Sequence, residues 1–271
     1  MSHSLGLAHL TLIELAPPQL VEAAAQAGFD RISVRIAPAS TGEAVAPMLG
    51  GAPMMRETLA RMRDLNVAVN DVEIILLKGD TDVPALEPIV AAAAQLGAQH
   101  ILVAGDDANE SALAQNFARL CELGARYGIR MGLEFMPWRG IKTLASARRV
   151  VGMAGAGGVI VDAIHLHRSG GTVEELAQLP PAQLAFFQIC DAPAQIPDTE
   201  EELLFQARRA RLPPGKGGLD LVGMVRALPA NAVIAIENPL HGLPDLLPPV
   251  PRARMLREAT LTVMEKAREQ H

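Results

Sequence analysis

Just past its midpoint the chain reads Val159-Ile-Val-Asp-Ala-Ile-His-Leu-His-Arg-Ser-Gly-Gly171. The β-branched residues at its start predict a buried strand, and the two glycines mark its end. Asp162 and His165 are three residues apart, so they would face opposite ways on a continuing strand. They converge only if the chain turns out of the strand near Ala163. A strand-end carboxylate followed by His and Arg is typical of the catalytic face of a barrel enzyme.

The rest of the chain alternates between strand and helix patterns. Strands are predicted at 5–13, 31–36, 67–77, 100–104, 130–135, 159–162, 184–190 and 232–237. Helices are predicted at 17–28, 54–65, 84–96, 110–127, 144–153, 172–179, 219–228 and 252–270, and a long loop precedes the helix at 219. Eight such pairs predict an α/β fold, a single (β/α)8 TIM barrel that spans residues 1–271. An open doubly wound sheet would need a glycine-rich turn after the first strand, where this chain has Glu14-Leu-Ala-Pro-Pro18.

The composition excludes several classes of protein. The 271 residues are 49% hydrophobic with a net charge of −6, which favours a large buried core over a basic surface for nucleic acid. Two distant cysteines, Cys121 and Cys190, indicate no disulfide framework. Neither a signal peptide nor a membrane-spanning run is apparent. We therefore expect a cytoplasmic protein that binds a small molecule, with no nucleic-acid or membrane partner, and that is compatible with a homo-oligomer.

Four consecutive strands offer an oxygen ligand where they end. These residues are Glu134, Asp162, Gln188 and Glu237. Because strand ends meet at one face of a barrel, the three carboxylates would repel one another unless a cation lay between them. Oxygen ligands favour a hard divalent ion. The alternative interpretation is that each carboxylate caps a helix or pairs with an arginine at the rim.

Five motifs resemble the sugar phosphate isomerase/epimerase superfamily, the xylose-isomerase-like TIM barrels, over nearly the whole chain. They are Gly132-Leu-Glu-Phe-Met-Pro137, Asp162-Ala-Ile-His-Leu-His-Arg-Ser-Gly-Gly171, Gln188-Ile-Cys-Asp-Ala-Pro193, Leu212-Pro-Pro-Gly-Lys-Gly217 and Ile236-Glu-Asn238. The resemblance implies one divalent ion (Mn²⁺, Mg²⁺ or Co²⁺) held by Glu134, Asp162, Gln188 and Glu237. It also implies that His165 lies beside the substrate, with Glu134, His165 and Glu237 as the catalytic groups.

The expected function is a metal-dependent isomerase or epimerase of carbohydrate metabolism, acting on a small polyhydroxylated carbonyl compound through a metal-stabilised enediolate. The alternative is a lyase that dehydrates a hydroxy-keto acid. Gln188 favours it, because many epimerases of the superfamily have His there, whereas Gln resembles the 3-dehydroshikimate dehydratase branch. An endonuclease IV-like repair enzyme is a weaker alternative, since that chemistry uses three zinc ions with many His ligands and this chain has seven His in all. A non-catalytic barrel conflicts with the complete ligand set.

Other residues are candidates for substrate binding. Arg35 ends the second strand and would bind a substrate anion or form a rim ion pair. Arg168 would bind substrate or fix its own loop. Arg208 and Arg211 lie in the loop after the seventh strand, where we expect anion binding. Trp138, the only Trp, would form a wall of the pocket or pack the rim.

Overall fold

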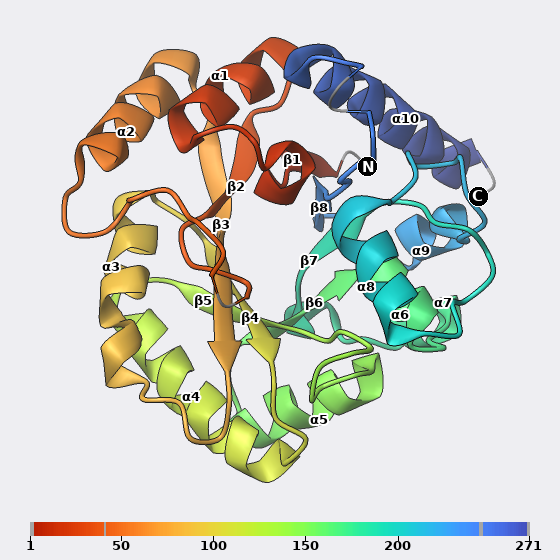
Figure 1. Ribbon diagram of the computed structural model, residues 1–271. Helices are drawn as coiled ribbons and strands as arrows, with labels where there is room; N and C mark the ends of the chain where they lie inside the picture. The colour runs from red at the N-terminus through yellow and green to blue at the C-terminus, as the bar shows by residue number, and fades with distance from the viewer. Residues whose placement is uncertain (1–2, 41, 244–245, 270–271) are drawn as a thin grey trace.

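A computed structural model describes residues 3–40, 42–243 and 246–269, and in this part of the chain eight parallel strands close into a barrel in sequence order. Helices surround the barrel on the outside (Figure 1). The strands are β1 (Ser4–Leu7), β2 (Arg31–Arg35), β3 (Ala68–Leu77), β4 (His100–Gly105), β5 (Arg130–Glu134), β6 (Gly158–Asp162), β7 (Leu184–Ile189) and β8 (Val233–Ile236). Pairing of β1 with β8 closes the ring, which confirms the predicted (β/α)8 barrel.

The helices follow the strands in the expected alternation. They are α1 (Pro17–Ala27), α2 (Pro53–Leu65), α3 (Glu87–Gln95), α4 (Glu110–Arg126), α5 (Leu144–Ala154), α6 (Ala163–Arg168), α7 (Val173–Ala177), α8 (Glu200–Arg209), α9 (Leu221–Ala227) and α10 (Pro249–Glu269). Short 3₁₀ turns lie at His9–Leu12, Pro84–Leu86 and Pro181–Gln183. The helix ends follow ordinary local chemistry. For example, prolines open α1 and Gly28 closes it with φ of 88°.

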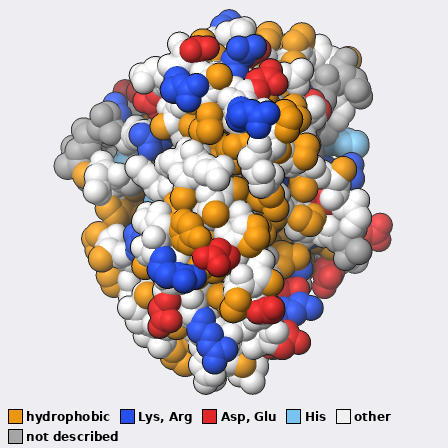
Figure 2. All heavy atoms as spheres, turned by 90° about the vertical axis from the view of Figure 1, so that its left-hand side faces the viewer, with side chains coloured by type: hydrophobic (Ala, Val, Ile, Leu, Met, Phe, Trp, Pro, Cys, Tyr) orange, Lys and Arg blue, Asp and Glu red, His pale blue; other side chains and the backbone are white. Residues whose placement is uncertain are grey.

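The strands are buried on both faces, as expected for a parallel sheet covered by helices. Every residue of β4 and β6 is buried. On the outer face formed by α2 and α3, apolar side chains lie among acidic and basic ones, so neither sign of charge dominates that face (Figure 2). Within the described ranges, no helix combines the length and apolar character needed to cross a membrane.

Four details differ from the sequence-based predictions. Residues 163–168, for which no helix was predicted, form the short helix α6. The first strand ends at Leu7 rather than residue 13, and a 3₁₀ turn follows it. The predicted loop after β7 contains α8. Its Thr199 cap, acidic first turn and basic last turn favour a helix, whereas the Arg, Pro and Gly residues of the same segment had indicated a loop. The last helix begins earlier, at Pro249, and the predicted end at Gln270 lies outside the described residues.

Candidate active site and metal centre

The four predicted ligand residues lie together at the C-terminal end of the barrel. Glu134 and Asp162 end β5 and β6, Gln188 lies next to the end of β7, and Glu237 directly follows β8. All four are buried. Side chains alternate along a strand, so the residue two positions earlier faces the same way. At three of the four strands that residue is apolar, which places an apolar layer of Ile160, Phe186 and Ala235 beneath the polar one.

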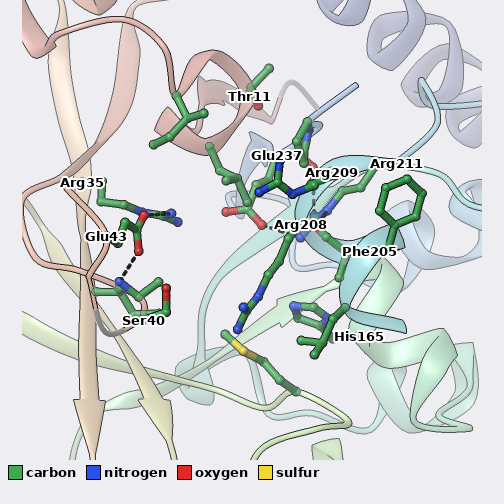
Figure 3. Close-up of a pocket in the computed structure, with 18 of the residues that line it drawn as sticks. Thr11, Arg35, Ser40, Glu43, His165, Phe205, Arg208, Arg209, Arg211 and Glu237 are labelled. Carbon is green, nitrogen blue, oxygen red and sulfur yellow. Dashed lines mark hydrogen bonds and ion pairs between the residues drawn. The ribbon is translucent and has the colours of Figure 1, made fainter. Parts of the chain in front are cut away.

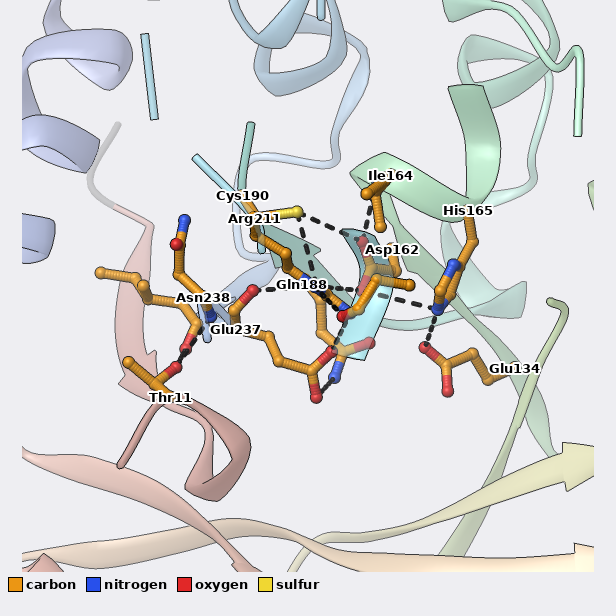
Figure 4. Close-up of polar contacts among 12 residues, drawn as sticks. Thr11, Glu134, Asp162, Ile164, His165, Gln188, Cys190, Arg211, Glu237 and Asn238 are labelled. Atoms are coloured by element: carbon orange, nitrogen blue, oxygen red, sulfur yellow. Dashed lines mark hydrogen bonds and ion pairs between the residues drawn. The ribbon is translucent and has the colours of Figure 1, made fainter. Parts of the chain in front are cut away.

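The turn after Asp162 brings His165 into the same site. Asp162 caps α6 by accepting a hydrogen bond from the Ile164 amide at 2.9 Å, so the chain leaves the strand where the sequence spacing required. Three residues after this cap, His165 Nε2 lies 3.7 Å from Glu134 Oε1 and 3.9 Å from Asp162 Oδ2 (Figure 4). His167 points elsewhere and contacts Arg168 through Nδ1.

Glu134, Asp162 and His165 form a cluster that could hold a metal ion, since one donor atom from each lies within 4.8 Å of the others. Gln188 and Glu237 adjoin each other, with Gln188 Nε2 3.1 Å from Glu237 Oε1. Glu134 Oε1 and Gln188 Oε1 are buried without a hydrogen-bond partner among the described residues. The donor set therefore suits a hard cation, because it supplies buried oxygen atoms that need a positive partner.

The site is electrostatically unusual because several acids share a buried volume. Burial raises the pKa of Glu134 well above its ordinary value, and Glu237 and Asp162 raise it further. Burial likewise raises the pKa of Glu237 to about 7, with Arg211 opposing the rise. The pKa of His165 is lowered well below 6.5 by burial and by the nearby Arg211 and Arg208. A bound divalent ion would oppose the protonation of the carboxylates, since positive charge favours their ionised form.

Above the cluster opens a cavity of about 940 Å³. Glu134, His165 and Glu237 line it, together with Arg35, Trp138, Arg208 and Arg211 (Figure 3). The rings of Trp138 and His165 meet edge to face, with centroids 5.0 Å apart. The Arg208 guanidinium lies 6.0 Å from the centroid of Trp138 and makes no hydrogen bond or ion pair with any other residue that the structure describes. Arg208 is therefore a cation available to a ligand in this cavity.

The other predicted arginines are held by protein groups. Arg35 donates to Glu73 at 2.9 and 3.1 Å and to Glu43 at 3.1 Å. Arg168 is not among the residues that line the cavity, and it donates to the Pro193 carbonyl and to Gln206 at 2.8 Å. Arg35 thus forms the rim ion pair that the sequence left open, and Arg168 fastens its loop to α8. Arg211 lies within the carboxylate cluster, a placement that sequence reasoning did not anticipate.

Sequence reasoning also overlooked Asp191, which organises the loop that carries Arg211. Its carboxylate accepts hydrogen bonds from four backbone amides, those of Ala192, Gly215, Gly217 and Leu219, at 2.9–3.1 Å. The loop also pairs with Asp191 through an isolated bridge to Leu212. Both parts of this arrangement are visible in the sequence, as the Asp that ends Gln-Ile-Cys-Asp191 and as the downstream Pro-Pro-Gly-Lys-Gly. That they bind each other becomes apparent only in the folded structure.

Comparisons with known proteins agree with this architecture. The chain is 33% identical to a 3-dehydroshikimate dehydratase of Pseudomonas aeruginosa over 145 residues, which cover 51% of this chain and 22% of that protein. A xylose isomerase-like TIM barrel/4-hydroxyphenylpyruvate dioxygenase fusion protein superposes with a TM-score of 0.83 at 22% identity, covering 100% of this chain and 44% of the fusion. An L-ribulose 3-epimerase structure superposes with a TM-score of 0.73 at 15% identity, over 99% of this chain and 97% of that one.

This chain corresponds to only part of two of these proteins. The match spans less than a quarter of the dehydratase and less than half of the fusion protein. Because the solved structures are at most 22% identical to this chain, their similarity supports the fold alone. The sequence profile of the xylose isomerase-like TIM barrel family matches residues 21–258, which is most of the chain. Together with the closed eight-stranded barrel and the motifs at its strand ends, this match confirms that the chain belongs to the xylose isomerase-like TIM barrel family.

Proposed function

We propose that this chain is a divalent-metal-dependent lyase that removes water from a small hydroxy-keto acid of the 3-dehydroshikimate type. The observation that carries the proposal is a cavity that combines a buried carboxylate–histidine cluster with the unpaired guanidinium of Arg208. Gln188 in the ligand set and the similarity to a 3-dehydroshikimate dehydratase add support. The expectation of an isomerase or epimerase becomes the second candidate.

Glu134, Asp162, Gln188 and Glu237 would hold the ion, which we expect to be Mn²⁺, Mg²⁺ or Co²⁺. A bound ion would polarise the carbonyl of the substrate and make the neighbouring C–H bond more acidic. Replacing Glu134 or Asp162 with Ala should remove metal binding in titration calorimetry with Mn²⁺. Binding as tight as in the parent would reject this ligand set.

His165 is the titratable group of the cluster that lies outside the proposed ligand set. Because its pKa is lowered, it is neutral near pH 7 and can accept a proton. It would take the proton from the carbon next to the carbonyl, and the resulting imidazolium would return a proton to the departing hydroxyl. One C–H bond and one C–O bond break, a C=C bond forms, and water leaves.

Arg208 would bind the substrate carboxylate. A guanidinium pairs well with a carboxylate, and Trp138 beneath it restricts its orientation. The Arg208→Ala variant should raise KM for an acidic substrate by roughly tenfold or more, from the loss of one charged hydrogen bond. Arg63→Ala, at an exposed position of α2 away from the cavity, is the matched control and should leave KM unchanged.

The decisive experiment incubates the Mn²⁺-loaded protein with 3-dehydroshikimate and follows the loss of one water by mass spectrometry. His165→Asn should lower kcat by roughly 10²–10⁴ while its metal content stays at the parent level. No loss of water at any metal loading would reject the lyase assignment. Full activity of the His165 variant would move the role of the base to Glu134 or Glu237.

The second candidate is an isomerase or epimerase, as first expected from the sequence. It is favoured by Glu134 and Glu237, which line the same cavity from β5 and from the end of β8, three strands further round the barrel. Two carboxylates on either side of a substrate carbon could exchange one proton for another. Solvent deuterium entering a ketose without loss of water would favour this activity over the lyase.

A further inference from the structure

The cation that lies among the strand-end carboxylates belongs to the chain itself. Arg211 follows α8, and its side chain, only 2% exposed, extends into the cluster. Its Nη1 lies 2.7 Å from Asp162 Oδ2, and its Nη2 lies 2.8 Å from Glu237 Oε2 (Figure 4). One guanidinium therefore bridges two of the four residues that we assign to the metal.

The guanidinium is held on its other sides as well. Its Nε donates to the Ala207 carbonyl at 2.6 Å, and Nη1 also donates to the Glu237 carbonyl at 2.8 Å. The backbone amide of Arg211 donates to the Pro239 carbonyl at 3.0 Å. These contacts form a built site for a guanidinium, because they fix it at both ends.

All four carboxylate oxygens of Asp162 and Glu237 are occupied by protein groups. Arg211 pairs with one oxygen of each carboxylate. The Ile164 backbone amide donates to the second oxygen of Asp162, and the Gln188 side-chain amide donates to the second oxygen of Glu237. By contrast, Glu134 Oε1 and Gln188 Oε1 have no hydrogen-bond partner among the described residues. A metal ion would therefore find free donors on one side of the site and would have to compete for those on the other.

We propose that Arg211 and the divalent metal ion are alternative cations for Asp162 and Glu237, so that metal binding displaces the guanidinium from at least one of these carboxylates. The inference rests on the proposed metal-dependent function. A guanidinium and a divalent ion that share the same buried oxygens repel each other, and this repulsion opposes metal binding. Arg211 therefore lowers the metal affinity of the site, while it keeps the buried carboxylates paired when no metal is bound.

The test compares Arg211→Met with Arg168→Met. Arg168 is the control because it is another buried arginine, and it contacts a carbonyl, an amide and the His167 ring but no carboxylate. Mn²⁺ titration calorimetry at mildly alkaline pH, where protons compete less for the ligands, should show Arg211→Met binding about tenfold tighter or more than the parent. Its melting temperature should fall much more without Mn²⁺ than with it, since bound metal stabilises only the folded state. Arg168→Met should bind Mn²⁺ like the parent and lose equal stability in both conditions.

A second measurement uses the parent protein and so does not depend on the folding of the variant. Addition of Mg²⁺ should accelerate solvent exchange of the Arg211 guanidinium protons in NMR spectra and leave those of Arg168 unchanged. Equal Mn²⁺ affinity in the parent and Arg211→Met, or an unchanged Arg211 signal in a Mg²⁺-loaded parent, would overturn the inference while leaving the metal site intact. If the parent binds neither ion, the proposed function fails as well.

Discussion

Asp191 should be among the most destabilising sites for substitution outside the apolar core. Asp191 is only 1% exposed, and its carboxylate accepts four backbone hydrogen bonds. The two amides bonded in a fully buried setting are those of Ala192 and Leu219. In Asp191→Ala each would lose its partner at a cost of about 1–3 kcal/mol, and the amides of Gly215 and Gly217 would add a smaller part. We expect the free energy of unfolding to fall by about 4 kcal/mol.

Asp191→Asn separates hydrogen bonding from side-chain size. The amide keeps one acceptor oxygen but places an NH₂ group against two N–H donors, so we expect a loss close to that of the Ala variant. Asp220→Ala is the matched control, because Asp220 accepts one bond, from the Gly223 amide, at the exposed start of α9. Loss of such a cap costs about 1 kcal/mol.

Chemical denaturation of the three variants measures these differences directly. Hydrogen exchange should in addition show faster exchange of the Gly215 and Gly217 amides in both Asp191 variants and unchanged exchange there in Asp220→Ala. If Asp191→Ala loses no more stability than Asp220→Ala, the amide bonds at Asp191 do not hold the loop, and the reasoning is refuted.

Two pH-dependent predictions concern groups away from the metal centre. Burial lowers the pKa of His100 to about 4, so the unfolded chain binds more protons than the folded one between the two pKa values. The free energy of unfolding should therefore decline as pH falls from about 6.5 to about 4. In denaturation curves, His100→Phe should flatten this decline. Burial, with a further contribution from Glu73, raises the pKa of Asp71 to about 8, so its effect has the opposite sign: stability is lost as pH rises from about 4 to about 8. Asp71→Asn keeps the acceptor for Ser33 and Asn70 and should be more stable than the parent at pH 8 but not at pH 4, and an equal difference at both would contradict this.

Much of the fold was predictable because it depends on local patterns. Short apolar runs bounded by glycine or proline indicated all eight strands, and their alternation with helices left the closed barrel as the consistent arrangement. The boundaries were less certain where two signals competed. The run from Leu5 had strand character beyond Leu7, but the observed backbone turns there, and the Thr11 side chain donates to the Ile236 carbonyl at the end of the neighbouring β8.

One rule, that parallel strands end at the same face of a barrel, predicted which residues group at the site. It did not predict the partner of each side chain. Parallel strands end at one face, so Glu134, Asp162, Gln188 and Glu237 were expected together, and the turn at Ala163 brought His165 among them. From the sequence, the carboxylates were expected either to share a cation or to cap helices and pair with arginines at the rim. The sequence did not indicate that Arg211 provides a cation, because this arginine is 49 residues from Asp162 and 26 from Glu237.

The sequence by itself thus determined the barrel, the family and the residue types at the strand ends, since these depend on periodicity and on short motifs. The tertiary structure alone decided which arginine is buried, which is paired and which is free. Arg35 is held by Glu73, Arg211 by Asp162 and Glu237, and Arg208 lies open over Trp138. These three arginines carry the same charge and all line the cavity, although Arg35 ends β2, Arg208 lies in α8 and Arg211 follows α8. They differ in their distances to carboxylates that other parts of the chain supply. Such distances arise when the barrel closes, and no local pattern records them.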